Sequence, residues 1–229
     1  MCKNRKGLHT NFCDRDNSHH CSLYIFGSTA EYDVISFGSL IAALQHRNPL
    51  NEIHRIMETN PNYIEETKNG MLPLHYACKR NAPLEVLEFL IQQYPASVKE
   101  KDNQGKLPLH YACKNNAPIQ VLEFLVQQYP DSFKEKSYYC KRLPLHFACM
   151  NNAPLEVLEF LVQRYPDSVM EKEYWGKLPL HLAWENNAPL QVLEFLVQQY
   201  PDAALPLHLE SCICEFHCFV FMLLTTLQG

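Results

Sequence analysis

The feature that most constrains this chain is a tetrapeptide, Leu-Pro-Leu-His, that recurs at a nearly fixed interval. Its copies begin at Leu72, Leu107, Leu143, Leu178 and Leu205, in steps of 35, 36, 35 and 27 residues. The first four copies lead into one longer pattern, in which Asn-Ala-Pro, then Val-Leu-Glu-Phe-Leu, then Tyr-Pro follow in order without a substitution. A period in this range is typical of a solenoid, in which one supersecondary unit stacks on its own copies. We therefore expect a repeat protein that has no single central core.

The residues after each tetrapeptide predict a short first helix. Pro73 has a fixed φ and no N–H, so it suits the first turn of a helix. Leu74, Ala77 and Cys78 then lie on one side of that helix, at positions i, i+3 and i+4. Asn81 follows about two turns later and can end the helix, because Asn tolerates the left-handed backbone conformation better than any residue except Gly.

A second helix is predicted directly afterwards. Pro83 suits its first turn, and the apolar residues that follow form a wide stripe, while Glu88 faces water. Pro95 stops the helix, because a residue that precedes proline disfavours the α conformation. The polar stretch from Val98 to Gly105 is expected to be extended and to turn back to the next tetrapeptide. The predicted unit is thus a helix, a tight turn, a second helix and a finger-like loop.

The chain is expected to divide into three parts. Residues 1–33 are polar without a helical period and predict a flexible lead-in. Residues 34–204 predict the array, and residues 205–229 a truncated, apolar partial repeat or cap. Within the array we expect a capping repeat at 34–70 and repeats at 71–105, 106–140, 141–175 and 176–204. For the last part, a packed cap helix, a sticky tail and the end of a longer, truncated array remain alternatives.

The repeat unit resembles the ankyrin repeat. The segment from Gly105 to Cys113, Gly-Lys-Leu-Pro-Leu-His-Tyr-Ala-Cys, is similar to the family's G-x-T-P-L-H-x-A-A opening, and the segment from Val121 to Leu125 is similar to its second-helix run. Asp102 to Gly105 resembles the family's finger tip. The resemblance covers residues 37–204, with four well-matched copies. It implies an all-α repeat solenoid of stacked helix–turn–helix units with short extended finger loops.

Three departures from the family pattern concern the loops. Leu stands in place of the family's Thr, and Asn in place of the Gly between the two helices. Cys140 and Lys141 replace the finger Gly before the third copy, so we expect that hairpin to be looser or differently turned.

Composition narrows the classes of partner and compartment. The formal net charge of −5 argues against nucleic acid, because phosphate binding requires clustered Lys and Arg. The apolar stretch near the end of the chain is shorter than the roughly 20 residues that a membrane span requires. Residues 1–24 lack the apolar run of a signal peptide, and the ten cysteines do not form a disulfide framework. We therefore expect an intracellular, most simply cytoplasmic, protein.

Potential reactive groups are interpreted as structural. His75 and Cys78 resemble a thiol–imidazole pair, but the pair recurs in the next two copies, and Trp184 replaces the cysteine in the fourth. A nucleophile requires one special environment, so the repetition favours packing. The resemblance implies that the ladder histidines bond turn backbone, which would make the fold mildly acid-sensitive.

Two clusters of Cys and His raise the alternative of a metal-binding protein. They are Cys13, His19, His20 and Cys21, and Cys212, Cys214, His217 and Cys218. The spacing of the first fits no zinc-finger pattern, and the ligands of the second lie too close together to surround one tetrahedral ion unaided. We assign no catalytic residue, no metal ligand and no cofactor.

Comparison of the copies within the chain separates the invariant skeleton from positions that change. The changing positions are the finger tips and the end of each first helix, and the resemblance implies that both face the concave, partner-binding side. Our candidate partner-binding residues are Asp102, Asn103, Gln104, Tyr138, Tyr139, Glu173, Tyr174, Trp175, Lys79, Arg80, Lys114, Asn115, Met150, Asn151, Glu185 and Asn186. The four aromatic residues either anchor a partner or pack against neighbouring fingers.

The leading prediction is a non-enzymatic scaffold that binds another protein. The rival is a structural spacer, or a fragment of a longer array, without a ligand of its own. The sequence leaves the partner's identity and the oligomeric state open.

Overall fold

The computed structural model describes residues 37–44 and 49–201. Spatial contacts divide the chain into Met1–Val34 and Ile35–Gly229, and the described residues all belong to the second unit. The lead-in at 1–33, the segment 205–229 and both Cys/His clusters lie outside the described residues, as does the fifth tetrapeptide.

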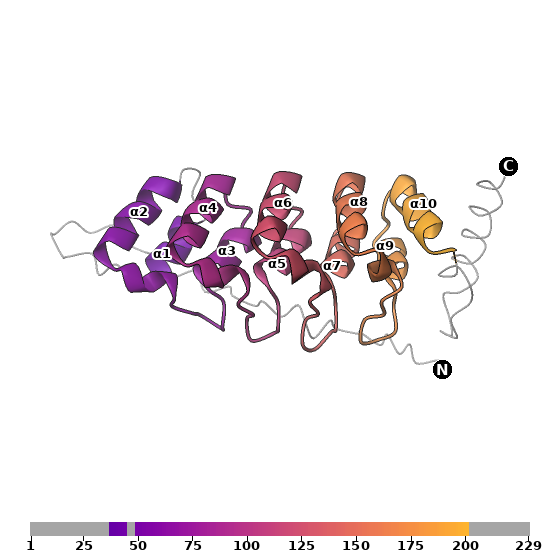
Figure 1. Cartoon of the computed structure of the whole chain (residues 1–229), viewed down its shortest axis with the longest axis horizontal. Coiled ribbons are helices and arrows are strands. Elements are labelled where there is room, and N and C mark those ends of the chain that lie inside the picture. The colour runs from indigo at the N-terminus through magenta and orange to yellow at the C-terminus, as the bar shows by residue number, and fades with distance from the viewer. Residues whose placement is uncertain (1–36, 45–48, 202–229) are drawn as a thin grey trace, which may run out of the picture. The chain divides into compact units, whose positions relative to one another are not determined.

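The described residues form helix pairs that follow one another in chain order (Figure 1). The α-helices are α1 Phe37–Ala43, α2 Pro49–Thr59, α3 Pro73–Lys79, α4 Leu84–Gln93, α5 Pro108–Lys114, α6 Ile119–Gln128, α7 Pro144–Met150, α8 Leu155–Arg164, α9 Pro179–Glu185 and α10 Leu190–Gln199. Each first helix from α3 onward packs against its own second helix and against the first helix of the next pair. Within the described ranges the sole β feature is an isolated bridge between Lys68 and Met71. The predicted all-α solenoid is confirmed.

Both ends of the first helices are formed as predicted. The proline of each tetrapeptide is the first residue of its helix, as Pro73 is in α3. The asparagine beyond each helix takes the left-handed conformation, with φ of 51° at Asn81, 52° at Asn116 and Asn152, and 55° at Asn187. The second helices start one residue later than expected, because Pro83 and its counterparts precede the helix instead of opening it.

The left-handed asparagines also join neighbouring repeats, which explains Asn where the family has Gly. Each of the first three donates a hydrogen bond from Nδ2 to a backbone carbonyl one repeat further on. The bonds run from Asn81 to Asn115 O (2.6 Å), from Asn116 to Asn151 O (2.7 Å) and from Asn152 to Asn186 O (2.8 Å). Glycine would permit the turn but has no side chain to make this bond.

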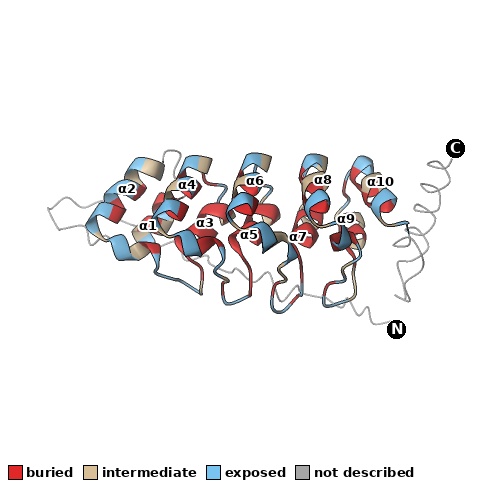
Figure 2. Ribbon diagram, viewed as in Figure 1, coloured by how far each residue is buried: buried red, intermediate tan, exposed pale blue. Residues whose placement is uncertain are grey.

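The core is a continuous apolar layer between the helices (Figure 2). Leu107 and Leu143, which stand where the family has Thr, are fully buried, so packing replaces the missing hydroxyl. Leu87, Leu122 and Leu158 on the second helices are also fully buried. Burial of one such side chain stabilises the fold by about 1.5–3 kcal/mol.

Short 3₁₀ helices follow the second helices, where the sequence predicted a direct change to extended chain. They are η1 Pro61–Ile64, η2 Pro95–Val98, η3 Pro130–Lys134 and η4 Pro166–Val169. Pro95 fixes φ near the helical value and so suits the first position of η2 as well as the end of α4. Ser97 reinforces the turn, since its hydroxyl donates to Tyr94 O at 2.6 Å.

The fingers turn back through hairpins closed by backbone hydrogen bonds. Asp102 N donates to Lys106 O at 3.0 Å, and Ser137 N donates to Arg142 O at 3.0 Å across one additional residue. That insertion accounts for the 36-residue step. Lys141 adopts φ +53°, close to the +73° of Gly105, and the hairpin of residues 137–142 is one residue longer than that of residues 102–106, so it is turned differently, which was one of the two alternatives expected.

Gly105 is expected to be far less tolerant of substitution than Gly176, although both have positive φ. A Cβ at Gly105 would lie 2.4 Å from Tyr138 Cγ and 2.7 Å from Tyr138 N, whereas one at Gly176 would meet nothing within 4 Å. Gly176→Ala should therefore cost only the left-handed strain, about 1–2 kcal/mol. Gly105→Ala should cost about 1–3 kcal/mol more, because the neighbouring finger must move. Urea denaturation of both variants measures the difference, and equal losses of stability would contradict the close approach.

Candidate functional site

Adjacent fingers are held together at their tips. Tyr138 N donates to Gln104 O, and Tyr174 N donates to Cys140 O, both at 2.8 Å. The ring of Tyr138 lies against Gly105 of the preceding finger. These contacts order the tips as one row, which we call the finger row and define as residues 99–106, 134–142 and 170–177.

Four aromatic side chains on the finger row are largely exposed. Tyr139 and Tyr174 each expose 68% of their surface, and Tyr138 and Trp175 each expose 51%. Tyr174 and Trp175 meet edge to face, with ring centroids 5.5 Å apart. Packing between fingers therefore accounts for part of the Tyr138 and Trp175 surfaces, whereas the role of the four rings as partner anchors stays a prediction.

A cation of the preceding finger lies over each of two of these rings. Lys101 Nζ lies 5.4 Å from the ring centroid of Tyr138, and Arg142 Cζ lies 5.4 Å from that of Trp175. A cation at this distance is attracted to the face of an aromatic ring. These contacts restrict the rings of Tyr138 and Trp175, so those two side chains have less freedom to lose on binding.

Two tip residues among the sequence candidates are buried, Asp102 and Glu173, each 4% exposed. Asp102 Oδ1 accepts hydrogen bonds from Gln104 N (2.9 Å) and Lys106 N (2.8 Å), and Oδ2 accepts one from the Tyr111 hydroxyl (2.6 Å). Its carboxylate therefore closes its own hairpin. The expectation that Asp102 and Glu173 are presented to a partner is wrong, because the short finger folds both side chains inward.

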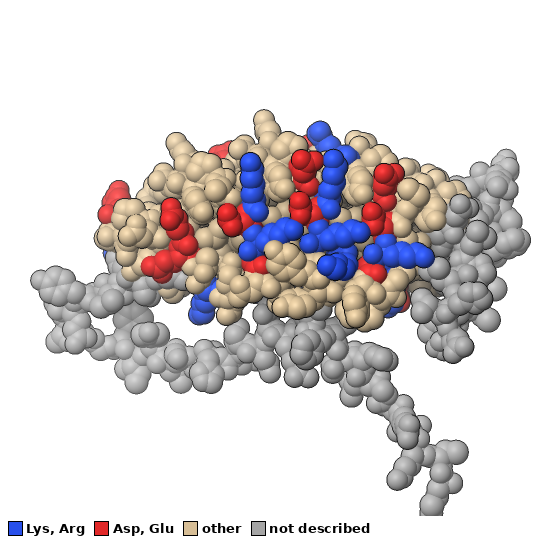
Figure 3. All heavy atoms as spheres, turned by 60° about the horizontal axis from the view of Figure 1, so that its bottom comes forward, with Lys and Arg blue, Asp and Glu red and all other residues tan. Residues whose placement is uncertain are grey.

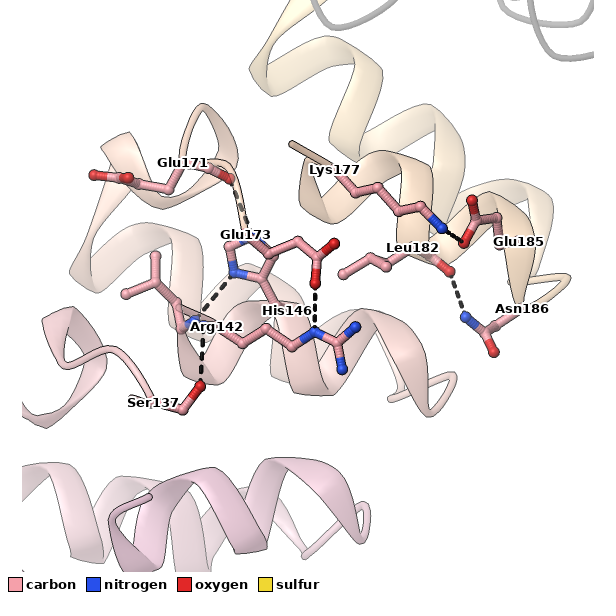
Figure 4. A network of polar contacts seen from close by, with 10 residues as sticks. Ser137, Arg142, His146, Glu171, Glu173, Lys177, Leu182, Glu185 and Asn186 are labelled. Carbon is pink, nitrogen blue, oxygen red and sulfur yellow. Dashed lines mark hydrogen bonds and ion pairs between the residues drawn. The ribbon is translucent and has the colours of Figure 1, made fainter. Parts of the chain in front are cut away.

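Glu173 instead forms a buried ion pair with Arg142 of the preceding finger (Figure 4). Arg142 Nε lies 2.7 Å from Glu173 Oε2, and the two side chains expose 9% and 0% of their surface. The other oxygen, Oε1, is buried without a hydrogen-bond partner. Leu182 follows Glu173 by nine residues, as Tyr111 follows Asp102, so the hydroxyl that bonds the second carboxylate oxygen in the earlier copy is missing here.

Asparagines at the ends of the first helices also serve the fold. Their Nδ2 groups donate to carbonyls of their own helix: Asn115 to Tyr111 O (2.8 Å), Asn151 to Phe147 O (2.8 Å) and Asn186 to Leu182 O (2.7 Å). Each of these asparagines is half-buried. This position varies in one copy only: in the first copy it is occupied by Arg80, which is exposed.

The other helix-end candidates differ in exposure. Lys79 and Lys114 are half-buried, and Met150 is half-buried against the core. Glu185 is exposed and paired with Lys177 Nζ at 2.7 Å, as Figure 4 shows. On the finger row itself, Asn103 and Gln104 are exposed.

Sequence analysis missed a ladder of ion pairs between successive fingers. Lys101 pairs with Glu135, and Lys136 pairs with Glu171, each at 2.7 Å. The Glu-Lys dipeptide that recurs after η2, η3 and η4 was the available signal, since stacking brings the lysine of one copy beside the glutamate of the next. These pairs are partly exposed, so each contributes at most about 1 kcal/mol.

The ladder histidines bond backbone, as the resemblance implied. Nδ1 accepts the N–H of the tetrapeptide's first leucine in four copies, at 3.1 Å for His75, 2.9 Å for His110, 3.1 Å for His146 and 2.9 Å for His181. In the first three copies Nε2 donates to a carbonyl of the following finger, at 3.0 Å from His110 to Glu135 O. This pattern requires the neutral ring. Burial lowers the pKa of His75, lowers that of His110 to about 3 and lowers that of His146 to about 4.

The cysteines beside these histidines are packing groups. Cys78, Cys113 and Cys149 are 1% exposed, and burial raises the pKa of each thiol well above its usual range. A thiol that stays protonated supplies no nucleophile. In the described part of the chain, no three or more His, Cys, Asp or Glu side chains gather as metal ligands would. Over the same residues, every helix is too short or too polar to cross a membrane.

Comparison with protein-family models agrees with this architecture. A model of three ankyrin repeats matches residues 40–137, and a model of a single ankyrin repeat matches residues 140–169, so the two cover more than half of the chain. A search of curated proteins gave no significant match. The stacked helix pairs, the finger hairpins and these matches lead to one conclusion: the chain belongs to the ankyrin repeat family.

Proposed function

We propose that this protein is a non-catalytic scaffold that binds a partner protein through its finger row and the adjoining ends of its first helices. Ankyrin repeats are generally protein–protein interaction modules, which supports the general class. The single observation that supports the location is the set of four exposed aromatic side chains at the finger tips, three of which contact a neighbouring ring, cation or finger. Aromatic residues held in place make effective interface anchors, because they bring a large contact area at a small entropic cost.

Not all sixteen sequence candidates enter the proposal. It retains the four tip aromatics, Asn103 and Gln104 on the fingers, and Lys79, Arg80, Lys114 and Glu185 on the helix ends. The proposal leaves out six candidates whose contacts stabilise the fold, namely Asp102, Glu173, Met150 and the helix-end asparagines Asn115, Asn151 and Asn186. We further propose an intracellular site of action, because Cys78, Cys113 and Cys149 are buried free thiols; among the described cysteines, Cys140 alone is disulfide-bonded.

The proposal predicts that Tyr139→Ala/Trp175→Ala weakens partner binding by at least about tenfold, the effect of losing an interface anchor. Both residues are exposed, so the melting midpoint should change little. Co-purification with wild-type protein identifies the partner, and titration then measures the loss of affinity. Leu190→Ala is the control, because Leu190 is an equally exposed apolar side chain (51%) on α10, outside the finger row. Unchanged binding in the double variant would refute this location, and an array without any partner would support the spacer interpretation.

A further inference from the structure

The finger row differs in charge from the rest of the molecule. It contains nine Lys and Arg against five Asp and Glu, whereas the whole chain has 20 against 25. Figure 3 shows Lys and Arg side chains gathered in a band across the face that carries the fingers. The second helices α4, α6, α8 and α10 have the opposite balance, with six glutamates and only Arg164 as a cation. The charge of the array is therefore divided between two surfaces.

Most carboxylates of the finger row are already used inside the array. Glu135 and Glu171 pair with lysines of the preceding fingers, Glu173 pairs with Arg142, and Asp102 bonds its own hairpin and Tyr111. Lys99, Lys141 and Lys172 are exposed on the same row, and Glu100 is its one exposed carboxylate. The surface that an approaching partner meets is thus aromatic and cationic.

We propose that the segment bound by the finger row is an acidic stretch of another protein, with carboxylates that lie against Lys141 and Lys172 beside the exposed aromatic rings. This inference rests on the proposed function and specifies its partner chemistry. Lys141 is exposed on the finger of residues 134–142. In sequence it lies between Tyr139 and Arg142, whose guanidinium supports Trp175, so one ligand can contact an aromatic ring and the Lys141 ammonium together. Complementary charge speeds encounter and sets the orientation of the partner.

A protein fits this surface better than a nucleic acid. Glu100, Glu135 and Glu171 occupy equivalent positions in the three fingers, at least partly exposed, and a continuous phosphate chain along the row would have to pass them. A peptide can set its carboxylates against the lysines and avoid the glutamates. The acidic second helices would also repel a long polyanion.

The test is selection from a random-peptide library on the full chain, followed by titration of the enriched peptides. Peptides are first sorted by whether Tyr139→Ala/Trp175→Ala weakens them, which identifies binding at the fingers. Their affinity is then measured for wild type, for Lys141→Glu/Lys172→Glu and for Arg164→Glu, an exposed control cation on α8. We expect finger-dependent peptides to be net acidic and to lose at least about tenfold in affinity in Lys141→Glu/Lys172→Glu. Their binding should also weaken as salt rises from about 0.05 to about 0.3 M.

The remaining outcomes separate this inference from the proposed function. Finger-dependent peptides that are neutral or basic, or that ignore the charge reversal, would overturn the acidic partner and leave finger binding intact. A set of peptides that all bind equally well to the aromatic variant would overturn both. A single-stranded oligonucleotide that binds wild type more tightly than the best acidic peptide at equal salt would overturn the inference in favour of nucleic acid.

Discussion

Acidification from pH 7 to about pH 5 is expected to lower the free energy of unfolding by several kcal/mol. In the unfolded chain a histidine has a pKa of about 6.5. Burial lowers the pKa of His75, and it lowers the pKa of His110 to about 3 and that of His146 to about 4. Below pH 6.5 these histidines therefore bind protons in the unfolded chain but stay neutral in the folded chain. Each histidine then reduces stability by up to about 1.4 kcal/mol per pH unit, and the loss continues until the pH reaches the folded pKa.

Urea denaturation at a series of pH values from about 8 to about 4 measures this effect. Stability should be nearly constant above pH 7 and fall steeply below pH 6.5. His146→Gln should be less stable than wild type at pH 8, since its buried bonds are altered, but its pH dependence should be shallower. A midpoint that stays constant between pH 8 and pH 5 would show that the neutral, buried histidines are not required.

Arg142→Met is expected to destabilise the protein by about 3–5 kcal/mol, the cost of leaving a buried charge without its partner. Glu173 exposes none of its side chain, and Oε1 already lacks a hydrogen bond, so removal of the guanidinium leaves the carboxylate in an apolar setting. The double variant Arg142→Met/Glu173→Leu should recover most of the loss, because paired apolar groups can replace a buried ion pair.

Denaturant titration of the single and double variants provides the measurement. Lys136→Met is a matched control. It removes the ion pair with Glu171, which has the same 2.7 Å separation and also joins two fingers, but about a third of each of its side chains is exposed. Its cost should stay below about 1 kcal/mol. Equal losses for Arg142→Met and Lys136→Met, or a double variant less stable than Arg142→Met, would contradict the buried-pair assignment.

The fold was predictable because its rules are local and repeated. Pro73 fixes a helix start, Asn81 a left-handed end and Pro95 a stop, and each rule applies again in every copy. The 3₁₀ turn at Pro95 was missed, since a proline that ends one helix also suits the first position of another.

The candidate site was less predictable, because variation between copies does not reveal which side chains face water. Asp102 and Glu173 vary between copies as exposed residues do, yet both are buried: Asp102 is held by its own hairpin, and Glu173 by Arg142 of the preceding finger. The ion pair between Arg142 and Glu173 joins residues about one repeat apart, and no local sequence pattern identifies such a partner. For the aromatic tips the sequence left two interpretations open, because nothing in the helical period requires them to pack and nothing in it excludes contact with a neighbouring finger.

The asparagine bonds between repeats have a consequence for how such a protein can change its length. Every described junction from α3 onward uses the same donor, the same acceptor position and the same backbone turn. A duplicated or deleted whole module therefore meets a neighbour that already presents the matching group. Gain or loss of modules by recombination would leave each remaining junction intact, so the extent of the array can vary while its joints do not.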